Sequence, residues 1–252
     1  IKCNIYPSSQ MGGQTEFSEG VMNGSIEACV LGPSYFGVID PFMYFLEMPY
    51  LFNDLEHARA LWETDNDALN TIKEHEEVGT LYRSPRIWCN NVRSVKTVTD
   101  NTGIKMRVPE SPISTALCKA MGANPVTVAW SECYTGLQSG LTDGVENAIT
   151  ELKNNNMHEV VKYSSETNHM LNAQGIMVSK AWFDKLTTDE QAAVMKAGLE
   201  ATQWRAEQLN TEVDACWVAF EEKGVEIIRH DDVDNAAFAE AAQVVYDEYI
   251  NN

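Results

Sequence analysis

The stretch 103–147 most constrains the fold, because it predicts two strand–helix units in succession. Apolar and basic side chains alternate over 104–108, which is the period of a strand with two unlike faces. Ser111 and Pro112 then predict a helix start, since serine caps free amides and proline needs no amide partner at the first helical position. One face of the helix is apolar: Ile113, Ala116, Leu117, Ala120 and Met121. Gly122 is its predicted left-handed end.

A second unit follows, with an apolar strand over 126–130, a cap at Ser131 and a helix over 132–139. In parallel α/β layers, small ligands bind at the carboxyl ends of the strands, beside helix N-termini. Arg107 and Trp130 lie at those ends. A guanidinium next to an indole suits an anion that also carries apolar or ring surface.

The flanking segments also alternate between strand and helix patterns. We expect a strand over 1–6, a helix over 15–23 and a strand over 26–31. A strand over 225–228 and a helix over 235–249 are expected at the other end. This order favours parallel sheets with crossover helices, and so an α/β fold.

One long helix is predicted over 189–223. Thr187 and Glu190 form a capping box before it, and no proline interrupts it. Its length would be about 50 Å, at a rise of about 1.5 Å per residue. Because that exceeds the width of one small domain, we expect the helix to pack against two bodies.

Aromatic residues gather in the loop region 32–52. Core packing beneath the loops is one interpretation, and the other is that Tyr35 or Phe36 lines a ligand cleft. Further on, three carboxylates predict a solvated face: Glu74, Glu76 and Glu77. Three arginines lie close together in a chain poor in cations: Arg83, Arg86 and Arg93. Surface solubility is the simplest interpretation of each, and position alone does not choose among them.

The charge and composition exclude several classes of function. The 252 residues are 44% hydrophobic and carry a formal charge of −19, which disfavours binding to nucleic acid or to anionic lipid. No run of about 20 apolar residues and no targeting pattern occurs. The six cysteines are irregularly spaced, so we expect most to be small buried hydrophobes, and no disulfide pairing is selected.

Metal and cofactor sites are not predicted. The five histidines lack zinc-ligand spacing, and we expect His169 to be neutral and to make structural hydrogen bonds. Phosphate loops, dinucleotide fingerprints and nucleophile elbows are also missing from the sequence. An α/β enzyme that uses Glu132 or Asp143 as acid and base on a small carboxylate is the alternative function.

Short motifs in order along nearly the whole chain resemble one family. They are Tyr-Pro-Ser-Ser-Gln-Met-Gly-Gly at 6–13, Met-Pro-Tyr-Leu-Phe at 48–52, Gly-Ile-Lys-Met-Arg-Val-Pro at 103–109, Gly-Ala-Asn-Pro at 122–125, Ser-Glu-Cys-Tyr-Thr-Gly-Leu-Gln-Ser-Gly at 131–140, Asp-Gly-Val-Glu-Asn at 143–147 and Thr-Asn-His at 167–169. The chain is similar to solute-binding proteins of tripartite ATP-independent periplasmic (TRAP) transporters, of the DctP type.

The resemblance implies a two-lobed periplasmic-binding-protein-like fold with a ligand cleft between the lobes and a long helix that spans both. Lobe I is expected at 1–84 plus 174–211, and lobe II at 85–173 plus 212–252. Family members begin with a strand and a helix that have no counterpart before Ile1, so we expect that unit to be missing from lobe I.

The resemblance also implies a function and site residues. Arg107 matches the carboxylate-binding arginine, Arg86 the second pocket arginine, Asn147 the pocket asparagine, Trp130 the stacking position and Glu110 a polar pocket position. Tyr35 and Phe36 complete the expected site. The protein would capture a small organic carboxylate by lobe closure and deliver it to the TRAP permease subunits. It would be a periplasmic monomer without cofactor, with its signal peptide removed.

Overall fold

The computed structural model describes residues 2–7, 9–37, 39–64 and 75–249. It has a mixed α/β architecture, which confirms the predicted fold class. The chain divides into two compact units. Unit 1 comprises Ile1–Leu46, Asp54–Arg83 and Asn172–Leu209, and unit 2 comprises Glu47–Asn53, Ser84–Leu171 and Asn210–Asn252. The lobe boundaries inferred from the resemblance stay a prediction.

Unit 1 contains a three-stranded antiparallel sheet in the order β1–β8–β2. The strands are β1 (Ala28–Leu31), β2 (His75–Tyr82) and β8 (Ala173–Ser179). The helices are α1 (Gln14–Asn23), the 3-10 turn η1 (Pro33–Phe36), α2 (Phe42–Phe45), α3 (Leu55–Thr64) and α8 (Lys180–Phe183). The helix expected at 15–23 and the strand expected at 26–31 are confirmed to within two residues. The expected parallel pairing is wrong here, because the neighbour of β1 is the antiparallel β8, which comes from a distant part of the chain.

The expected strand at 1–6 is wrong for residues 2–6, which are exposed and lie in no strand. Residue 1 lies outside the described residues. A local alternation of side chains forms a strand only where a neighbouring strand shares its backbone hydrogen bonds, and residues 2–6 pair with no described strand.

The solvated face expected for three glutamates is wrong at Glu77, which is buried in β2. The Thr80 hydroxyl donates a 2.7 Å hydrogen bond to Glu77 Oε1, and burial raises the pKa of this carboxyl to about 7. Glu76 is half-buried, and Glu74 lies outside the described residues. The prediction failed because these residues belong to a strand that alternates between two covered faces.

Unit 2 is built on a six-stranded sheet in the order β5–β4–β6–β3–β7–β9. The strands are β3 (Arg86–Asn90), β4 (Lys105–Val108), β5 (Asn124–Thr127), β6 (Gly144–Ala148), β7 (Tyr163–Ser165) and β9 (Glu226–Ile228). β5, β4 and β6 are parallel, whereas β3 runs antiparallel to both β6 and β7. The carboxyl ends of β4, β5 and β6 therefore lie at one edge of the sheet.

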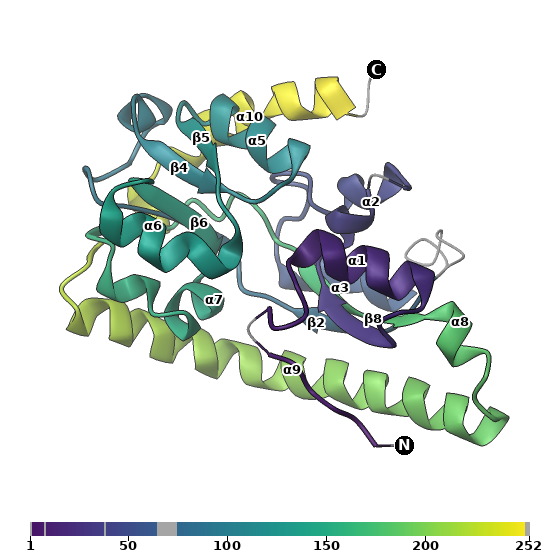
Figure 1. Cartoon of the computed structure of the whole chain (residues 1–252). Coiled ribbons are helices and arrows are strands. Elements are labelled where there is room, and N and C mark those ends of the chain that lie inside the picture. Colours follow the sequence, from purple (N-terminus) through teal and green to yellow (C-terminus); the bar gives the residue numbers. More distant parts are fainter. Residues whose placement is uncertain (1, 8, 38, 65–74, 250–252) are drawn as a thin grey trace. The chain divides into compact units, whose positions relative to one another are not determined.

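Helices cover both faces of this sheet: α5 (Pro112–Ala120) and α10 (Asn235–Tyr249) on one side, and α6 (Cys133–Ser139) and α7 (Ile149–Asn154) on the other (Figure 1). Short 3-10 turns lie between these elements, among them η2 (Val98–Asn101), η4 (Met157–Glu159) and η5 (His230–Asp232). The predicted start of α5 is confirmed, since Ser111 Oγ accepts a hydrogen bond from the Ser114 amide. The predicted helix over 235–249 is confirmed at both ends.

The second predicted strand is displaced. β5 ends at Thr127, and Trp130 begins the 3-10 turn η3 (Trp130–Glu132) instead of ending a strand. β5 pairs residue by residue with β4, which ends at Val108 before Pro109. The backbone beyond Val128 therefore has no strand to pair with.

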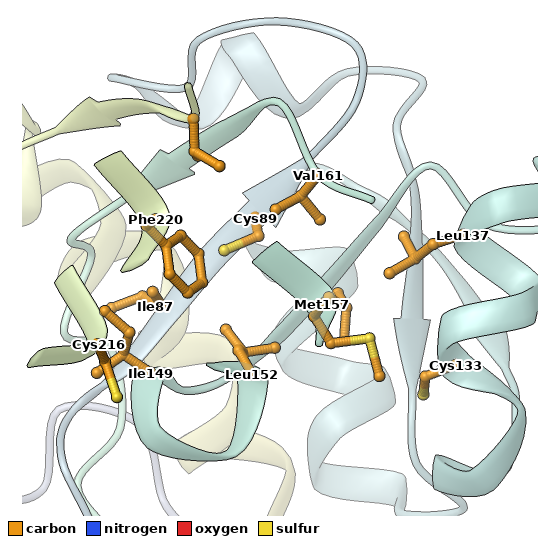
Figure 2. Close-up of a cluster of buried hydrophobic side chains, with 12 residues drawn as sticks. Ile87, Cys89, Cys133, Leu137, Ile149, Leu152, Met157, Val161, Cys216 and Phe220 are labelled. Carbon is orange, nitrogen blue, oxygen red and sulfur yellow. The ribbon is translucent and has the colours of Figure 1, made fainter. Parts of the chain in front are cut away.

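A cluster of buried apolar side chains fills the space between the sheet of unit 2 and the helices α6, α7 and α9 (Thr188–Glu222) (Figure 2). It consists of Ile87, Cys89, Cys133, Leu137, Val145, Ile149, Leu152, Met157, Val161, Cys216, Phe220 and Val225. Its three cysteines, and Cys118 elsewhere in unit 2, are buried free thiols, as expected for most of the six. Cys29 is half-buried and Cys3 is exposed.

The predicted long helix is confirmed as the single helix α9 (Thr188–Glu222) of 35 residues. Its capping box forms as expected, with Glu190 Oε2 accepting from the Thr187 amide at 2.9 Å. The helix belongs to unit 1 up to Leu209 and to unit 2 from Asn210. In the described ranges, no helix combines the length and the apolar character needed to cross a membrane.

Candidate functional site

The structure places five of the seven predicted site residues in unit 2 and two in unit 1. Those in unit 2 are Arg86 on β3, Arg107 on β4, Asn147 on β6, Trp130 in η3 and Glu110 just after β4. Tyr35 and Phe36 lie in η1 of unit 1. The predicted residues therefore form two separate groups, each with its own local geometry.

Arg107 is the penultimate residue of β4 and is only 3% exposed. Its Nε donates a 2.8 Å hydrogen bond to the carbonyl of Val128, and its guanidinium carbon lies 5.2 Å from the centroid of the Trp130 ring. Within the described residues, the guanidinium faces no carboxylate, and its terminal nitrogens Nη1 and Nη2 have no acceptor. Arg107 is thus a buried, oriented cation with donors available for an anion.

Asn147 lies on the same face of the sheet as Arg107. Arg107 pairs with Val145 across the parallel β4–β6 ladder, and Asn147 is two residues further along β6. Asn147 Oδ1 accepts a 2.9 Å hydrogen bond from the Ala148 amide, so the side-chain NH₂ points the other way as a donor. Arg107 and Asn147 therefore lie on one face of the sheet, near the carboxyl ends of two neighbouring parallel strands.

Arg86 lies on the opposite face, because Ile87 rather than Arg86 pairs with Asn147. Its Nε and Nη2 donate to the two carboxylate oxygens of Glu146 at 2.6 and 2.7 Å. Both residues are buried. The structure brings Arg86 together with Glu146 rather than with Arg107, so its charge is already balanced.

His169 completes this buried group. Its Nε2 lies 3.2 Å from Glu146 Oε2, and its Nδ1 lies 2.8 Å from the Thr167 hydroxyl. Burial lowers the pKa of His169, which confirms the expected neutral ring with structural hydrogen bonds. Burial alone would raise the pKa of Glu146, but Arg86 and His169 hold it well below the usual carboxyl range.

The role of Glu146 was not predicted from the sequence. The alternation of side chains along a strand could have indicated it. Glu146 and Asn147 are adjacent in β6, so their side chains must point to opposite faces of the sheet. Surface solubility was also the wrong expectation for Arg83 and Arg86, which are both buried, whereas Arg93 is exposed.

The remaining predicted residues differ in exposure. Trp130 is half-buried and packs against the apolar cluster of unit 2, while Glu110 is exposed. In unit 1, Tyr35 is half-buried. Phe36 is fully buried and stacks on His75, with 4.5 Å between the two ring centroids. Phe36 therefore offers no exposed ring surface in this structure.

The geometry of unit 2 fits an organic anion better than a metal ion. A buried guanidinium lies against an indole ring, next to the carboxyl ends of parallel strands in this mixed sheet. In the described part of the chain, no three His, Cys, Asp or Glu side chains gather in a way that could hold a metal.

Comparison with known proteins agrees with this chemistry. Residues 1–252 match the family "Bacterial extracellular solute-binding protein, family 7", DctP. A 2,3-diketo-L-gulonate-binding periplasmic protein of Escherichia coli is 30% identical over 245 residues, which cover 96% of this chain and 74% of the relative.

Two solved structures are also similar. A TRAP periplasmic solute-binding protein of Xanthobacter autotrophicus with bound β-D-galacturonate is 27% identical, with a TM-score of 0.93 over 100% of this chain and 85% of that one. Another, from Roseobacter denitrificans with bound L-galactonate, is 27% identical, with a TM-score of 0.88 over 96% and 81% of the two chains. The chain therefore belongs to the DctP family of bacterial extracellular solute-binding proteins, which serve TRAP transporters.

Proposed function

We propose that this protein captures a small organic monocarboxylate, of the sugar-acid class, for a TRAP transporter. Members of its family bind small acids and work with membrane permease subunits. The two compact units would be the two lobes, and their closure around the solute would precede delivery to the permease. We place the protein in the periplasm and expect it to be a monomer.

The observation that carries this proposal is the state of Arg107. A guanidinium binds a carboxylate through two parallel hydrogen bonds, and the pair is strong when it is shielded from water. Arg107 is buried, is oriented by the Val128 carbonyl and the Trp130 ring, and meets no protein carboxylate in the described residues. A solute carboxylate would supply the missing negative charge.

Charge balance favours one carboxylate over two. Arg86 is paired with Glu146, so the sheet of unit 2 offers the uncompensated charge of Arg107 but not that of Arg86. Glu110 follows the carboxyl end of β4 and would repel a second carboxylate there. The ligands named for the three relatives above each carry a single carboxylate, which supports the same choice.

The other residues have proposed supporting roles. The amide of Asn147 would donate to the carboxylate or to a hydroxyl next to it, and the Trp130 ring would cover an apolar face of the sugar. Arg86 would act on the solute indirectly, by fixing Glu146 next to Asn147 in β6, and Glu110 would accept from a hydroxyl. Tyr35, which is half-buried, would contribute its ring from unit 1, whereas Phe36 is buried against His75 and would have a packing role.

An enzyme is not favoured by the positions of its candidate residues. Asp143 Oδ2 accepts from the Lys105 amide at 2.9 Å, at the start of β4 and therefore at the edge away from Arg107. Glu132 is exposed in η3. We propose that both are structural.

Calorimetry with a set of acids tests the proposal. D-galacturonate, D-glucuronate and L-galactonate represent sugar acids, and succinate represents dicarboxylates. We expect at least one sugar acid to bind at least tenfold more tightly than succinate and to be recovered unchanged, as judged by NMR after incubation. Tighter binding of succinate would contradict the choice of a monocarboxylate, and consumption of the acid would favour the enzyme.

A further inference from the structure

Left-handed backbone occurs at a non-glycine residue in each of two segments that join the two units. Segment 47–53 belongs to unit 2 but interrupts the sequence of unit 1, and segment 166–171 leads from β7 to the point where unit 1 resumes. Among the described residues, four non-glycine residues have positive φ: Ser9, Tyr50, Asn156 and Asn168. Two of the four lie in these short segments.

Tyr50 is the more unusual of the two. Its φ is 55°, in the left-handed region that a bulky side chain rarely adopts. Asn168 has a φ of 45°, which asparagine tolerates better. Such conformations persist only where the surrounding contacts hold them.

Contacts between the two segments hold Tyr50. Its amide donates a 2.8 Å hydrogen bond to the carbonyl of His169, and its hydroxyl lies 3.4 Å from the carbonyl of Thr167. The neighbouring Pro49 carbonyl accepts from the Tyr246 hydroxyl of α10 at 2.7 Å. Burial raises the pKa of the Tyr50 phenol, so it stays a neutral donor.

Asn168 and the next residues are held by other parts of unit 2. Asn168 Nδ2 lies 3.2 Å from His230 Nδ1 in η5. The carbonyl of Met170 accepts a 2.9 Å hydrogen bond from the Arg86 amide at the start of β3. Segment 166–171 is therefore fixed on both sides of His169.

His169 connects these segments to the candidate site. Its backbone carbonyl accepts from Tyr50, while its ring contacts Glu146, the residue before Asn147. One residue therefore couples the strained segment 47–53 to the strand that carries a proposed solute contact. A shift of His169 would disturb both at once.

We propose that the paired segments 47–53 and 166–171 form a strained latch, in which Tyr50 and Asn168 are left-handed only while the latch is closed. The latch changes state when the units rearrange on solute capture, so this inference rests on the proposed function. The strain then contributes to the energy difference between the two states, and so to the affinity for the solute.

Glycine and alanine variants at the same position isolate the strain. Both remove the side chain, but only alanine is strained at positive φ. We compare Tyr50→Gly with Tyr50→Ala, and Asn168→Gly with Asn168→Ala. Asn156, which has a φ of 60° at the start of η4 and lies outside both segments, provides the matched control pair.

The readout is the dissociation constant for D-galacturonate. We expect the glycine and alanine variants to differ by about fivefold at residue 50 and at residue 168, because the strain is present in only one of the two states. At residue 156 they should differ in melting temperature but bind equally, because that strain is present in both. Equal affinities within the pairs at 50 and 168 would overturn the latch.

A second measurement needs no solute. Hydrogen exchange of peptides covering 47–53 and 166–171 should be faster in Tyr50→Ala than in Tyr50→Gly, with exchange in β4 and β5 unchanged. If the wild-type protein binds none of the acids, the proposed function fails while this measurement still decides the latch. Identical exchange in the two Tyr50 variants would refute it.

Discussion

Removal of the Glu146 charge is expected to destabilise the protein severely. Glu146 is buried with Arg86, which holds both of its oxygens at 2.6 and 2.7 Å. Glu146→Gln keeps the shape but places an NH₂ group against the guanidinium and leaves the Arg86 charge without its partner. Breaking one side of a buried ion pair costs about 3–5 kcal/mol, and we expect a loss of that order.

Urea unfolding followed by circular dichroism measures this loss. Glu159→Gln is a suitable control, because Glu159 pairs with Lys223 at the exposed surface and its loss should leave the midpoint unchanged. The double variant Arg86→Met with Glu146→Leu should recover part of the stability, because it removes both charges together but leaves the buried His169 Nε2 without its partner. The reasoning would be refuted by a Glu146→Gln midpoint equal to that of the wild type, or by a double variant less stable than Glu146→Gln.

Two further predictions concern unit 1. The pKa of Glu77 is raised from 4.5 to about 7 in the folded protein, so the folded state favours the neutral carboxyl, and stability is lost as pH rises from 4.5 through 7. Glu77→Gln should therefore raise the melting temperature at pH 8 but not at pH 4, and an equal effect at both values would contradict this. Gly198→Ala should lower the free energy of unfolding by about 1–3 kcal/mol, because its new Cβ would clash with the Val78 carbonyl oxygen. In the control Gly136→Ala, the new Cβ would make only ordinary van der Waals contacts, so the urea midpoint should stay the same or rise. Equal midpoints for the two variants would contradict the close approach of Gly198 in α9 to Val78 in β2.

Helix ends were predictable from sequence because their signals are local. Ser111 and Pro112 start α5, and Thr187 with Glu190 starts α9, through contacts within one turn of the chain. Patterns that depend on distant partners failed. The end of β5 is set by the end of β4, and the direction of β1 pairing is set by β8.

The candidate site, like the fold, was predictable only in part from the sequence. Arg107, Trp130 and the family motif around Asn147 are visible in the sequence, and the structure brings the first two into contact. The partner of Arg86 was not visible, because Glu146 lies 60 residues away and reaches Arg86 only through the β3–β6 pairing. The left-handed backbone of Tyr50 was also hidden, since tyrosine gives no signal for positive φ.

The central claim is that Arg107 binds the solute carboxylate, and one titration tests it most directly. Calorimetry with D-galacturonate compares the wild type, Arg107→Lys and the control Arg93→Lys. Arg93 is exposed and donates to the backbone carbonyls of Asp100 and Thr102, so its substitution keeps the charge and leaves the site alone.

Lysine keeps the charge at position 107 but cannot form the paired hydrogen bonds or stack on Trp130. We expect Arg107→Lys to weaken binding at least about 30-fold, equivalent to about 2 kcal/mol, while Arg93→Lys stays within about twofold of the wild type. An unchanged affinity for Arg107→Lys, in a protein that binds D-galacturonate, would contradict the claim.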